Sequence, residues 1–361
     1  MSELPTAETP RSLGYRFPAE WEPHAATWLA WPRNPATWPG IFAQIPGQFA
    51  QFARAVARFE PVHILAAGET AARSAEQYMA GVARVTIHDI PTNDSWIRDF
   101  GPTFLVSEDP GRPKALVDWG YNAWGGKYPP FDADNAVPAE IARRFAWHRF
   151  HPGLVLEGGS IDGNGQGLLL TTASCLLHPS RNPGLNRADI EWYLRHYLMI
   201  DQVIWLAGEI AGDDTDGHID QLARFVAPRT VVHAFEENSS DVNHRPLAEL
   251  ERMLRQVRLS DGEPLRLVRL PMPAPVYHQE RRVPACYANF YIVNGAVIVP
   301  QFDDPADHRA LEILGELIAD REVVGVPCRD LIWGLGAFHC LSQQQPGTEE
   351  GEKALVATAS G

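Results

Sequence analysis

Apolar residues recur along this chain in short blocks that switch between a helix-like and a strand-like spacing. The clearest helix-like block spans residues 41–59, where apolar side chains stand three or four positions apart at Phe42, Ile45, Phe49, Phe52, Val56 and Phe59. This spacing places them on one face and predicts an amphipathic helix. Pro61 then ends the helix, and the apolar block 62–65 predicts a strand.

The alternation continues along most of the chain. We expect further strands at 26–31, 85–87, 115–119, 167–171, 202–206, 223–225 and 231–234, and further helices at 70–79, 139–145, 187–197, 247–256 and 310–318. Residues 290–293 and 296–299 are joined by Asn294-Gly295, a dipeptide typical of a two-residue hairpin turn. The predicted class is α/β or α+β, with more strands than helices. No GxGxxG motif opens a helix after the first strand, which disfavours a dinucleotide site.

A single domain is expected between residues 15 and 346, because no linker-like segment or charge block divides this range. Residues 1–14 are predicted to form a flexible lead, and the small and polar residues 347–361 to fray as a tail. The N-terminus lacks the basic and apolar regions of a secretory signal, and no apolar run is long enough for a membrane span.

Composition narrows the classes of partner. The chain has 361 residues with 31 basic and 45 acidic side chains, which gives a formal charge of −14. This excess argues against a nucleic-acid partner, whose phosphates bind clustered Lys and Arg. It is compatible with a cationic substrate, although solubility is the simpler explanation. The four cysteines are scattered without a CxxC pair, which predicts free thiols in a reducing cytoplasm rather than disulfides or a cysteine-based zinc site.

One cysteine has an unusual setting. Cys340 follows Gly334 and Gly336 and precedes a glutamine cluster that ends at Pro346. Glycine lets the backbone bend and approach a ligand closely, whereas a structural cysteine normally lies in an unbroken apolar run. Cys340 is therefore a candidate nucleophile, with a buried structural thiol as the alternative.

Polar side chains gather in three further segments. In the first, residues 93–102, Trp96 is expected to form one wall of a pocket for a planar cation beside Asp99, unless the segment is an ordinary surface turn with a local pair between Arg98 and an aspartate. In the second, Glu157 is followed by two glycines, which fits either a tight turn near a ligand or a plain turn.

The third segment, residues 213–220, contains four aspartates and His218. This concentration of negative charge is costly unless a cation is bound. If His218 and Asp220 lie on an extended strand, their side chains point the same way and line one site. A calcium or magnesium site is the alternative, but the EF-hand spacing and a HExxH motif are absent.

Together the segments supply a thiol, an imidazole, several carboxylates and an aromatic wall. A guanidinium group is planar and permanently cationic, and two opposed carboxylates can bind its N–H groups in fork geometry. They would hold its central carbon in front of a thiolate while a histidinium protonates the departing nitrogen. Water would then hydrolyse the covalent thiouronium, and neither a metal nor an organic cofactor is needed.

These residues resemble the agmatine deiminases, which group with the bacterial-type peptidylarginine deiminases in the guanidino-group-modifying superfamily. The resemblance runs from about residue 14 to residue 346. It is carried by ordered motifs at 93–102 (NDSWIRDFGP), 118–128 (DWGYNAWGGKY), 157–160 (EGGS), 181–183 (RNP), 214–220 (DTDGHID), 287–291 (YANFY) and 339–340 (HC) with the glutamines that follow.

The resemblance implies a pentein fold, an α/β-propeller of five ββαβ-like units around a pseudo-fivefold axis. It also implies that Cys340 is the nucleophile, that His218 is the acid/base, and that Asp99 and Asp220 grip the guanidinium group. The further substrate-binding candidates that fall in family motifs are Trp96, Asp94, Glu157, Asp214 and Asn289. The implied reaction is the hydrolysis of agmatine to N-carbamoylputrescine and ammonia, a step toward putrescine, in a cytoplasmic enzyme that is often a homodimer or larger.

Three positions depart from the family pattern. Leu335 and Ala337 stand where the family commonly has glycine and asparagine, and Cys286 stands where it usually has serine. The first two lie beside the nucleophile, so they bear on what the far end of the substrate contacts. Arginine, a peptidyl arginine or another alkylguanidine is therefore an alternative substrate. A carboxylate-rich metal-dependent hydrolase and a catalytically silent cation binder are the alternatives from other classes.

Overall fold

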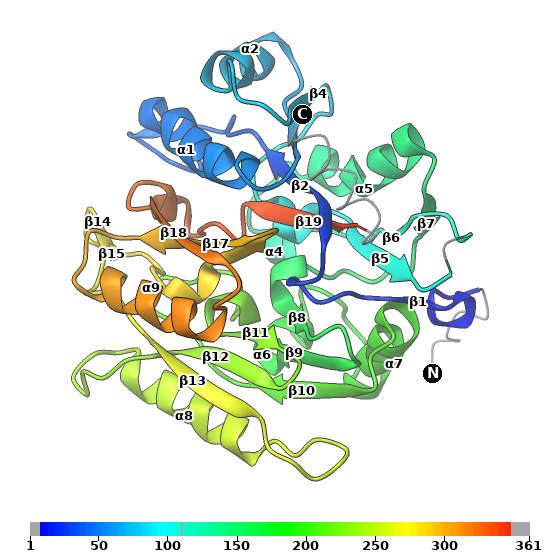
Figure 1. The fold of residues 1–361 in the computed structure, drawn as a ribbon, viewed down its shortest axis with the longest axis vertical. Coiled ribbons are helices and arrows are strands. Elements are labelled where there is room, and N and C mark those ends of the chain that lie inside the picture. The colour runs from blue at the N-terminus through cyan, green and yellow to red at the C-terminus, as the bar shows by residue number, and fades with distance from the viewer. Residues whose placement is uncertain (1–7, 110, 348–361) are drawn as a thin grey trace.

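The chain builds five repeated units that follow one another around a common centre (Figure 1). The computed structural model describes residues 8–109 and 111–347. Each unit contains two antiparallel strands, then a helix, then a third strand that pairs parallel to the second strand. The helices lie on the outside of the ring (Figure 1). The predicted ββαβ-like units are therefore present.

Four units follow directly along the chain. The first contains β5 (Thr103–Ser107), β6 (Ala115–Val117), α5 (Asp132–Phe145) and β7 (His148–Phe150). The second contains β8 (Ile161–Gly163), β9 (Leu168–Thr172), α7 (Arg187–Leu198) and β10 (Gln202–Leu206). The third contains β11 (Ala223–Ala227), β12 (Thr230–Phe235), α8 (His244–Gln256) and β13 (Arg266–Pro271). The fourth contains β16 (Tyr291–Val293), β17 (Ala296–Gln301), α9 (Ala306–Leu317) and β18 (Glu322–Pro327).

The fifth unit is assembled from both ends of the chain. Its first strand is the C-terminal β19 (Ser342–Pro346), which pairs antiparallel with β2 (His24–Ala30). The unit continues through α1 (Ile45–Ala57) to β3 (Val62–Leu65), and α2 (Glu69–Tyr78) and β4 (Val85–His88) extend its sheet. Figure 1 shows the red β19 beside the blue β2, where the ring closes.

Shorter elements complete the described chain. β1 (Tyr15–Arg16) pairs with β5, and β14 (Tyr277–His278) forms a small hairpin with β15 (Arg281–Arg282). The short helices are α3 (Ile97–Phe100), α4 (Ala123–Gly126), α6 (Ala173–Leu176), η1 (Arg11–Leu13), η2 (Phe42–Gln44), η3 (Gly158–Ser160), η4 (Ile219–Gln221), η5 (Tyr287–Asn289) and η6 (Leu331–Gly334). No helix in the described part of the chain is long and apolar enough to cross a membrane.

Hydrophobic burial explains why the predicted helices and strands form where they do. The apolar face of α1, which includes Phe49, Phe52 and Val56, is fully buried and packs toward β3, β17 and β18. The middle strand of each unit lies between two neighbours, and β17 is buried at its first five positions, so it is apolar throughout rather than alternating. The predicted Asn294-Gly295 hairpin between β16 and β17 is confirmed.

Two sequence predictions need adjustment at their edges. The helix expected at 139–145 begins earlier, at Asp132, and continues through Pro138. Within the predicted flexible lead, Arg11–Leu13 forms η1, and the Arg11 guanidinium lies 3.0 Å from an Asp201 carboxylate oxygen. Most of the predicted tail and the first half of the predicted lead, residues 348–361 and 1–7, lie outside the described residues. Gly347 is described, and its backbone N–H donates to the Pro23 carbonyl at 2.7 Å.

Candidate active site

A short helical turn precedes the first strand of every unit. These turns are α3, η3, η4, η5 and residues 338–341. Consecutive turns contact one another, from α3 to η3, from η3 to η4 and from η4 to η5. Every unit contributes at least one predicted site residue on or beside its turn: Asp99, Glu157, His218 with Asp220, Asn289, and Cys340. The repeat of the fold thus gathers groups that are far apart in sequence.

The Cys340 thiol lies between an amide and a carboxylate. Its Sγ is 3.2 Å from Asn289 Nδ2 and 3.4 Å from Asp220 Oδ2, and its backbone N–H donates to Asn289 Oδ1. The residue is 4% exposed. Burial raises the pKa of the Cys340 thiol well above its usual value, and the charges of Asp220 and Asp99 raise it further. The thiol is therefore protonated until something offsets the two carboxylates.

Three polar groups converge above Gly159. A methyl group at this position would lie 2.6 Å from His218 Nδ1, 2.7 Å from Asp99 Oδ1 and 3.0 Å from Asp220 Oδ2. Only a residue without a side chain leaves room for this approach. Gly159 is the second glycine after Glu157, in the segment that the sequence suggested as a turn near a ligand. The packing of the site thus requires a glycine at this position.

His218 is fully buried, and its ring faces Asp99. Its Nδ1 is 3.6 Å from Asp99 Oδ1, and among the described residues neither ring nitrogen has a hydrogen-bond partner. Burial lowers the pKa of His218, but the charge of Asp99 and contacts with Cys175 and Asp220 outweigh burial and hold the pKa well above its ordinary value. His218 is therefore an imidazolium at neutral pH, able to give a proton to a bound molecule.

Asp99 and Asp220 both present charge to the same space. Asp99 accepts hydrogen bonds from the Gly159 backbone N–H at 2.9 Å and from Trp124 Nε1 at 3.0 Å. Burial raises the pKa of Asp99 to about 6, against the opposing charge of His218. Asp220 Oδ1 is buried and accepts no hydrogen bond from any described residue. Buried polar atoms are rarely left unpaired, so the free oxygen and the free imidazole indicate a missing polar ligand.

A cavity of about 610 Å³ opens above these groups. Its walls include the predicted residues Trp96, Asp99, Cys340, Asp94 and Asp214, together with Trp124, Tyr128, Arg33, Lys127, Arg281 and Leu335. His218, Asp220 and Asn289 are buried beneath this lining and contact Asp99 or Cys340 directly. A small planar cation would therefore meet Asp99 and the thiol, with Asp220 directly behind the thiol. Three more carboxylates, those of Asp94, Asp134 and Asp214, belong to the same lining.

The glycines before Cys340 serve the pocket wall as well as the ligand. A methyl group at Gly334 would lie 2.8 Å from the Trp96 ring, and one at Gly336 would lie 2.6 Å from that ring and 3.0 Å from Cys340 Cβ. Both glycines are therefore required for close contact with the Trp96 indole. The sequence suggested a different role for them, the close approach of the backbone to a ligand. Trp96 itself is buried and forms part of the cavity wall, as predicted.

The two unusual residues beside the nucleophile have different positions. Leu335 lines the cavity and has a φ of +74°, in the left-handed region that glycine adopts without strain. Ala337 is buried outside the lining, and its backbone N–H donates to Asn289 Oδ1 at 3.2 Å. Leu335 is therefore the departure that a bound molecule can touch.

The acidic segment 213–220 is not an extended strand. His218 directly precedes the short helix η4, and Asp216 and Gly217 have φ values of +68° and +92°, so the chain turns before His218. The Asp213 carboxylate accepts from the backbone N–H groups of Thr215 and Gly217, both at 2.9 Å. The expectation of period-two alternation was wrong, because these side chain-to-backbone bonds favour a turn.

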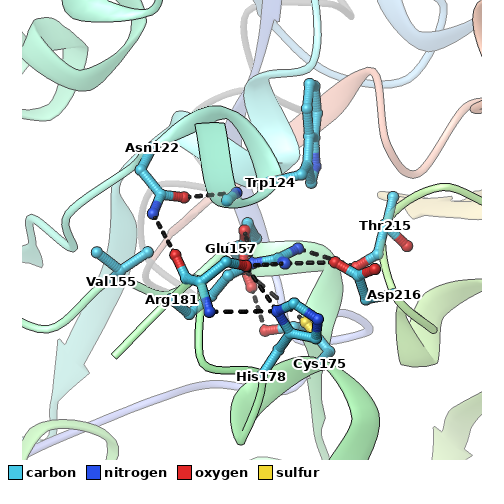
Figure 2. Close-up of polar contacts among 12 residues, drawn as sticks. Asn122, Trp124, Val155, Glu157, Cys175, His178, Arg181, Thr215 and Asp216 are labelled. Carbon is cyan, nitrogen blue, oxygen red and sulfur yellow. Dashed lines mark hydrogen bonds and ion pairs between the residues drawn. The ribbon is translucent and has the colours of Figure 1, made fainter. Parts of the chain in front are cut away.

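Arg181 is a site residue to which the sequence reading assigned no role. Figure 2 shows its guanidinium between Glu157, at 2.8 Å, and Asp216, and it also donates to the Thr215 carbonyl at 3.0 Å. Arg181 therefore ties the loop that carries His218 to the η3 turn. Arg181 and Lys127, whose Nζ lies 2.9 Å from an Asp216 carboxylate oxygen, are cations of the protein itself. They balance the negative charge for which the sequence suggested an external cation.

Glu157 does not line the cavity. It is fully buried, pairs with Arg181, and its other oxygen faces Cys175 Sγ at 3.9 Å (Figure 2). Glu157, Cys175 and His218 place ligand-type atoms within 4.8 Å of one another, an arrangement that could suit a metal ion. The Arg181 guanidinium beside Glu157 would repel a divalent cation there, which disfavours a metal at this group.

Comparisons with known proteins agree with this geometry. Residues 16–346 match the model of the Porphyromonas-type peptidyl-arginine deiminase family. An agmatine deiminase of Pseudomonas aeruginosa (strain LESB58) is 40% identical over 94% of this chain and 97% of its own length. An agmatine deiminase of Stutzerimonas stutzeri (strain A1501) is 38% identical over the same shares of the two chains.

Solved structures show the same fold. An agmatine deiminase of Enterococcus faecalis, described as catalysing its reaction, has a TM-score of 0.89 at 30% identity and covers 96% of this chain and 99% of its own. A cysteine-to-serine variant of a C. jejuni agmatine deiminase with substrate bound has a TM-score of 0.85 at 32% identity, covering 92% and 96%. The pentein fold predicted from the sequence is confirmed.

Proposed function

The chain belongs to the Porphyromonas-type peptidyl-arginine deiminase family, and we propose that it hydrolyses agmatine to N-carbamoylputrescine and ammonia through a covalent intermediate on Cys340. The observation that carries the proposal is the set of unpaired buried atoms around the thiol. A free carboxylate oxygen of Asp220 and two free nitrogens of His218 lie beside Asp99 and Cys340. A guanidinium ion supplies the N–H donors and the positive charge that this set lacks.

Binding of the guanidinium group also prepares the nucleophile. The pKa of the Cys340 thiol is raised by burial and by the charges of Asp220 and Asp99. A cation held between these carboxylates cancels the two charges and favours the thiolate. The thiol is thus reactive when the substrate is in place, and its proton is released to water as the cation binds.

The reaction follows in two halves. The thiolate attacks the guanidinium carbon, a C–S bond forms, and His218 as imidazolium gives its proton to the nitrogen that leaves as ammonia when the C–N bond breaks. Neutral His218 then takes a proton from water as that water attacks the thiouronium carbon. The C–S bond breaks, the new hydroxyl group loses its proton to water or ammonia as the carbamoyl C=O forms, and the thiolate is restored. Trp96 belongs to the same cavity wall as Asp99 and Cys340, so its ring offers the reacting group an apolar surface.

The far end of the cavity favours a second cationic group over a carboxylate. Asp94 and Asp214 line the cavity, and burial raises the pKa of both carboxyls, to about 6 for Asp94, so Asp94 is mostly ionised at neutral pH. The terminal ammonium of agmatine complements such carboxylates, whereas arginine adds an α-carboxylate. Arginine or a peptidyl arginine is the competing substrate class, because Arg33 and Arg281 line the same cavity.

A direct substrate comparison tests the proposal. Wild-type protein is expected to release ammonia and a ureido product from agmatine with a kcat/KM at least about tenfold above that for arginine. An unmatched carboxylate that costs about 1.4 kcal/mol or more accounts for such a factor, because about 1.4 kcal/mol corresponds to tenfold. The measurement uses a colour assay for the ureido group with agmatine, arginine and a short arginine peptide. A preference for arginine or the peptide would replace agmatine as the substrate and leave the chemistry in place.

The same assay separates the metal-dependent alternative. Activity should survive exhaustive chelation and be lost after prolonged treatment with iodoacetamide, which alkylates the thiolate form of Cys340. Loss of activity on chelation, with recovery on addition of a divalent metal, would favour a metal-dependent hydrolase. Saturable agmatine binding without any ammonia would indicate a silent cation binder.

Trp124 is predicted to support the grip of Asp99 on the substrate. Trp124→Phe removes the indole N–H that donates to Asp99 at 3.0 Å, so KM for agmatine should rise about tenfold or more, because a hydrogen bond to a charged group is worth about 1.5–3 kcal/mol. The lost donor also raises the pKa of Asp99 above about 6, so activity on the acid side should fall at a higher pH.

The matched control is Trp205→Phe. Trp205 also donates its indole N–H to a carboxylate, that of Glu191 at 2.7 Å, but on the outer side of the second unit. Steady-state kinetics between pH 5 and 9 should show the shift for Trp124→Phe and none for the control. Equal effects in both variants would contradict a specific role for Trp124.

The cellular setting extends the proposal. All four cysteines are buried and free, which fits a reducing cytoplasm and a small cationic metabolite as partner. A homodimer or higher assembly is proposed from the family resemblance, and light scattering coupled to size-exclusion chromatography tests it.

A further inference from the structure

His339, the residue before the nucleophile, lies between two buried carboxylates. Its Nδ1 is 2.8 Å from Asp220 Oδ2, and its Nε2 is 2.9 Å from Glu20 Oε2. The imidazole is 2% exposed. Only the Nδ1 contact with Asp220 has hydrogen-bond geometry, whereas Nε2 meets Glu20 Oε2 as an ion pair. Two carboxylates this close to one imidazole favour its charged form electrostatically. The geometry therefore favours a positive charge on His339.

Glu20 is itself held as an anion. Arg224 and Arg98 place guanidinium nitrogens 2.8 Å and 3.5 Å from Glu20 Oε2, and the backbone N–H of Ile292 donates to its other oxygen at 2.8 Å. Burial raises the pKa of Glu20, but Arg224, His339 and Arg98 outweigh burial and hold the pKa well below its usual range. A fixed anion behind His339 thus stabilises the imidazolium.

The effect reaches the reaction site through Asp220. His339 occupies Asp220 Oδ2, the oxygen that also lies 3.4 Å from Cys340 Sγ, and leaves Oδ1 unpaired among the described residues. Without a charged donor on Oδ2, a carboxylate this deeply buried would take up a proton. With it, Asp220 stays ionised and its free oxygen keeps one direction.

We propose that His339 is a positioning residue for the reaction: as an imidazolium between Glu20 and Asp220, it keeps Asp220 ionised and aims its free oxygen at the guanidinium group. His339 touches neither the substrate nor the leaving group. The inference deepens the proposed function, since it assumes that Asp220 binds a guanidinium ion. It explains why a histidine adjoins the nucleophile although the acid/base role falls to His218.

The charged and titratable groups around this pair come from every neighbouring turn. They are Glu20 from the segment before β2, Asp99 and Arg98 of α3, His218 beside η4, Arg224 of β11, and Cys340. In the wild type we expect the acid limb of the pH profile to follow Asp99 and Asp94, whose pKa values burial raises to about 6. Asp220, with a lowered pKa, does not appear in it.

His339→Asn tests the proposal. The asparagine amide can still donate near Asp220 but carries no charge and does not reach Glu20. The pKa of Asp220 should therefore rise, so that the acid limb of kcat/KM moves upward by about one pH unit or more and steepens as a further carboxylate titrates. KM for agmatine at pH 8 should rise about tenfold to a hundredfold, with a smaller change in kcat.

A binding measurement separates the proposed hydrolysis of agmatine from the proposed positioning role of His339. Calorimetric titration of agmatine into the Cys340→Ser protein, with and without His339→Asn, should show the same weakening as KM. If the wild type does not act on agmatine, the proposed function fails whatever the variant does. If the wild type is active and His339→Asn keeps its acid limb and its agmatine affinity within threefold, the role of His339 is overturned.

Two further variants guard against a folding artefact. Glu20→Gln leaves His339 in place and removes only the outer charge, so the acid limb should move in the same direction by a smaller amount. His308→Asn is the matched control, because that side chain is 83% exposed on α9, and it should leave the profile unchanged. Circular dichroism and thermal melting verify folding. A loss of activity equal at every pH in both buried-site variants would indicate a merely structural role and contradict the proposal.

Discussion

Cys340→Ser is expected to lower kcat for agmatine by about ten-thousandfold or more, because removal of a nucleophile abolishes the covalent route and leaves only binding to act. Agmatine affinity should stay within a few-fold, since Asp99 and Asp220 rather than the thiol supply the charge that holds the cation. Serine also keeps the small volume of the buried site, where Cys340 is 4% exposed.

The decisive measurement for this variant is intact-mass spectrometry after mixing with agmatine and quenching in acid. The wild type should carry an amidino adduct that maps to Cys340, and Cys340→Ser should carry none. Cys328→Ala is the control, because Cys328 is a buried thiol packed in the hydrophobic core away from the cavity lining. Ammonia release by Cys340→Ser at a rate near that of the wild type would exclude the covalent mechanism.

His218→Gln is the variant with the second-largest expected effect. Its kcat should fall by about a hundredfold to ten-thousandfold, the usual range for loss of a general acid–base group, with KM changed only a few-fold. The physical reason is that the pKa of His218 is held well above its ordinary value, mainly by Asp99 against the effect of burial, so that the protein starts each turnover with a proton ready for the leaving nitrogen.

Rapid quenching shows which half-reaction fails. With His218→Gln the amidino adduct should form slowly, because ammonia cannot leave without a proton, and any adduct formed should persist. His196→Gln on α7 is the matched control, since its ring nitrogen bonds a helix carbonyl and lies outside the site. An unchanged kcat, or a rise in KM without a fall in kcat, would remove His218 from the acid/base role.

The nucleophile candidate and one carboxylate could be predicted from local patterns. Cys340 stood out because glycines and glutamines surround it, and Asp99 because it lies three residues after a tryptophan in a polar segment. Each of these clues is contained within about ten residues. In the structure both residues line the same cavity.

The supporting residues could not be found in this way, because their roles depend on which turns become neighbours. His339 and Asp220 are separated by 119 positions, and Arg181 and Glu157 by 24. Long-range pairing of this kind leaves no spacing pattern in a single sequence.

Polar strands were missed for a related reason. β19 contains three glutamines and looks like a loop, yet it is buried at its first four positions. Gln344 accepts from Arg98 at 2.7 Å and Gln345 accepts from Trp28 at 2.9 Å, so the polarity is satisfied inside the molecule. Hydrophobic periodicity detects the burial of apolar side chains, but it does not detect a buried strand whose polar side chains are hydrogen-bonded inside the protein.

The split fifth unit has a consequence for how the protein is made. β2 leaves the ribosome near the start of synthesis, but its partner β19 is among the last described segments to emerge. A nascent chain can therefore build four units while β2 has an unpaired edge, and in this period it has no Cys340. Ring closure and arrival of the nucleophile are the same late event, so a prematurely terminated chain is an exposed, inert fragment rather than a partly active enzyme.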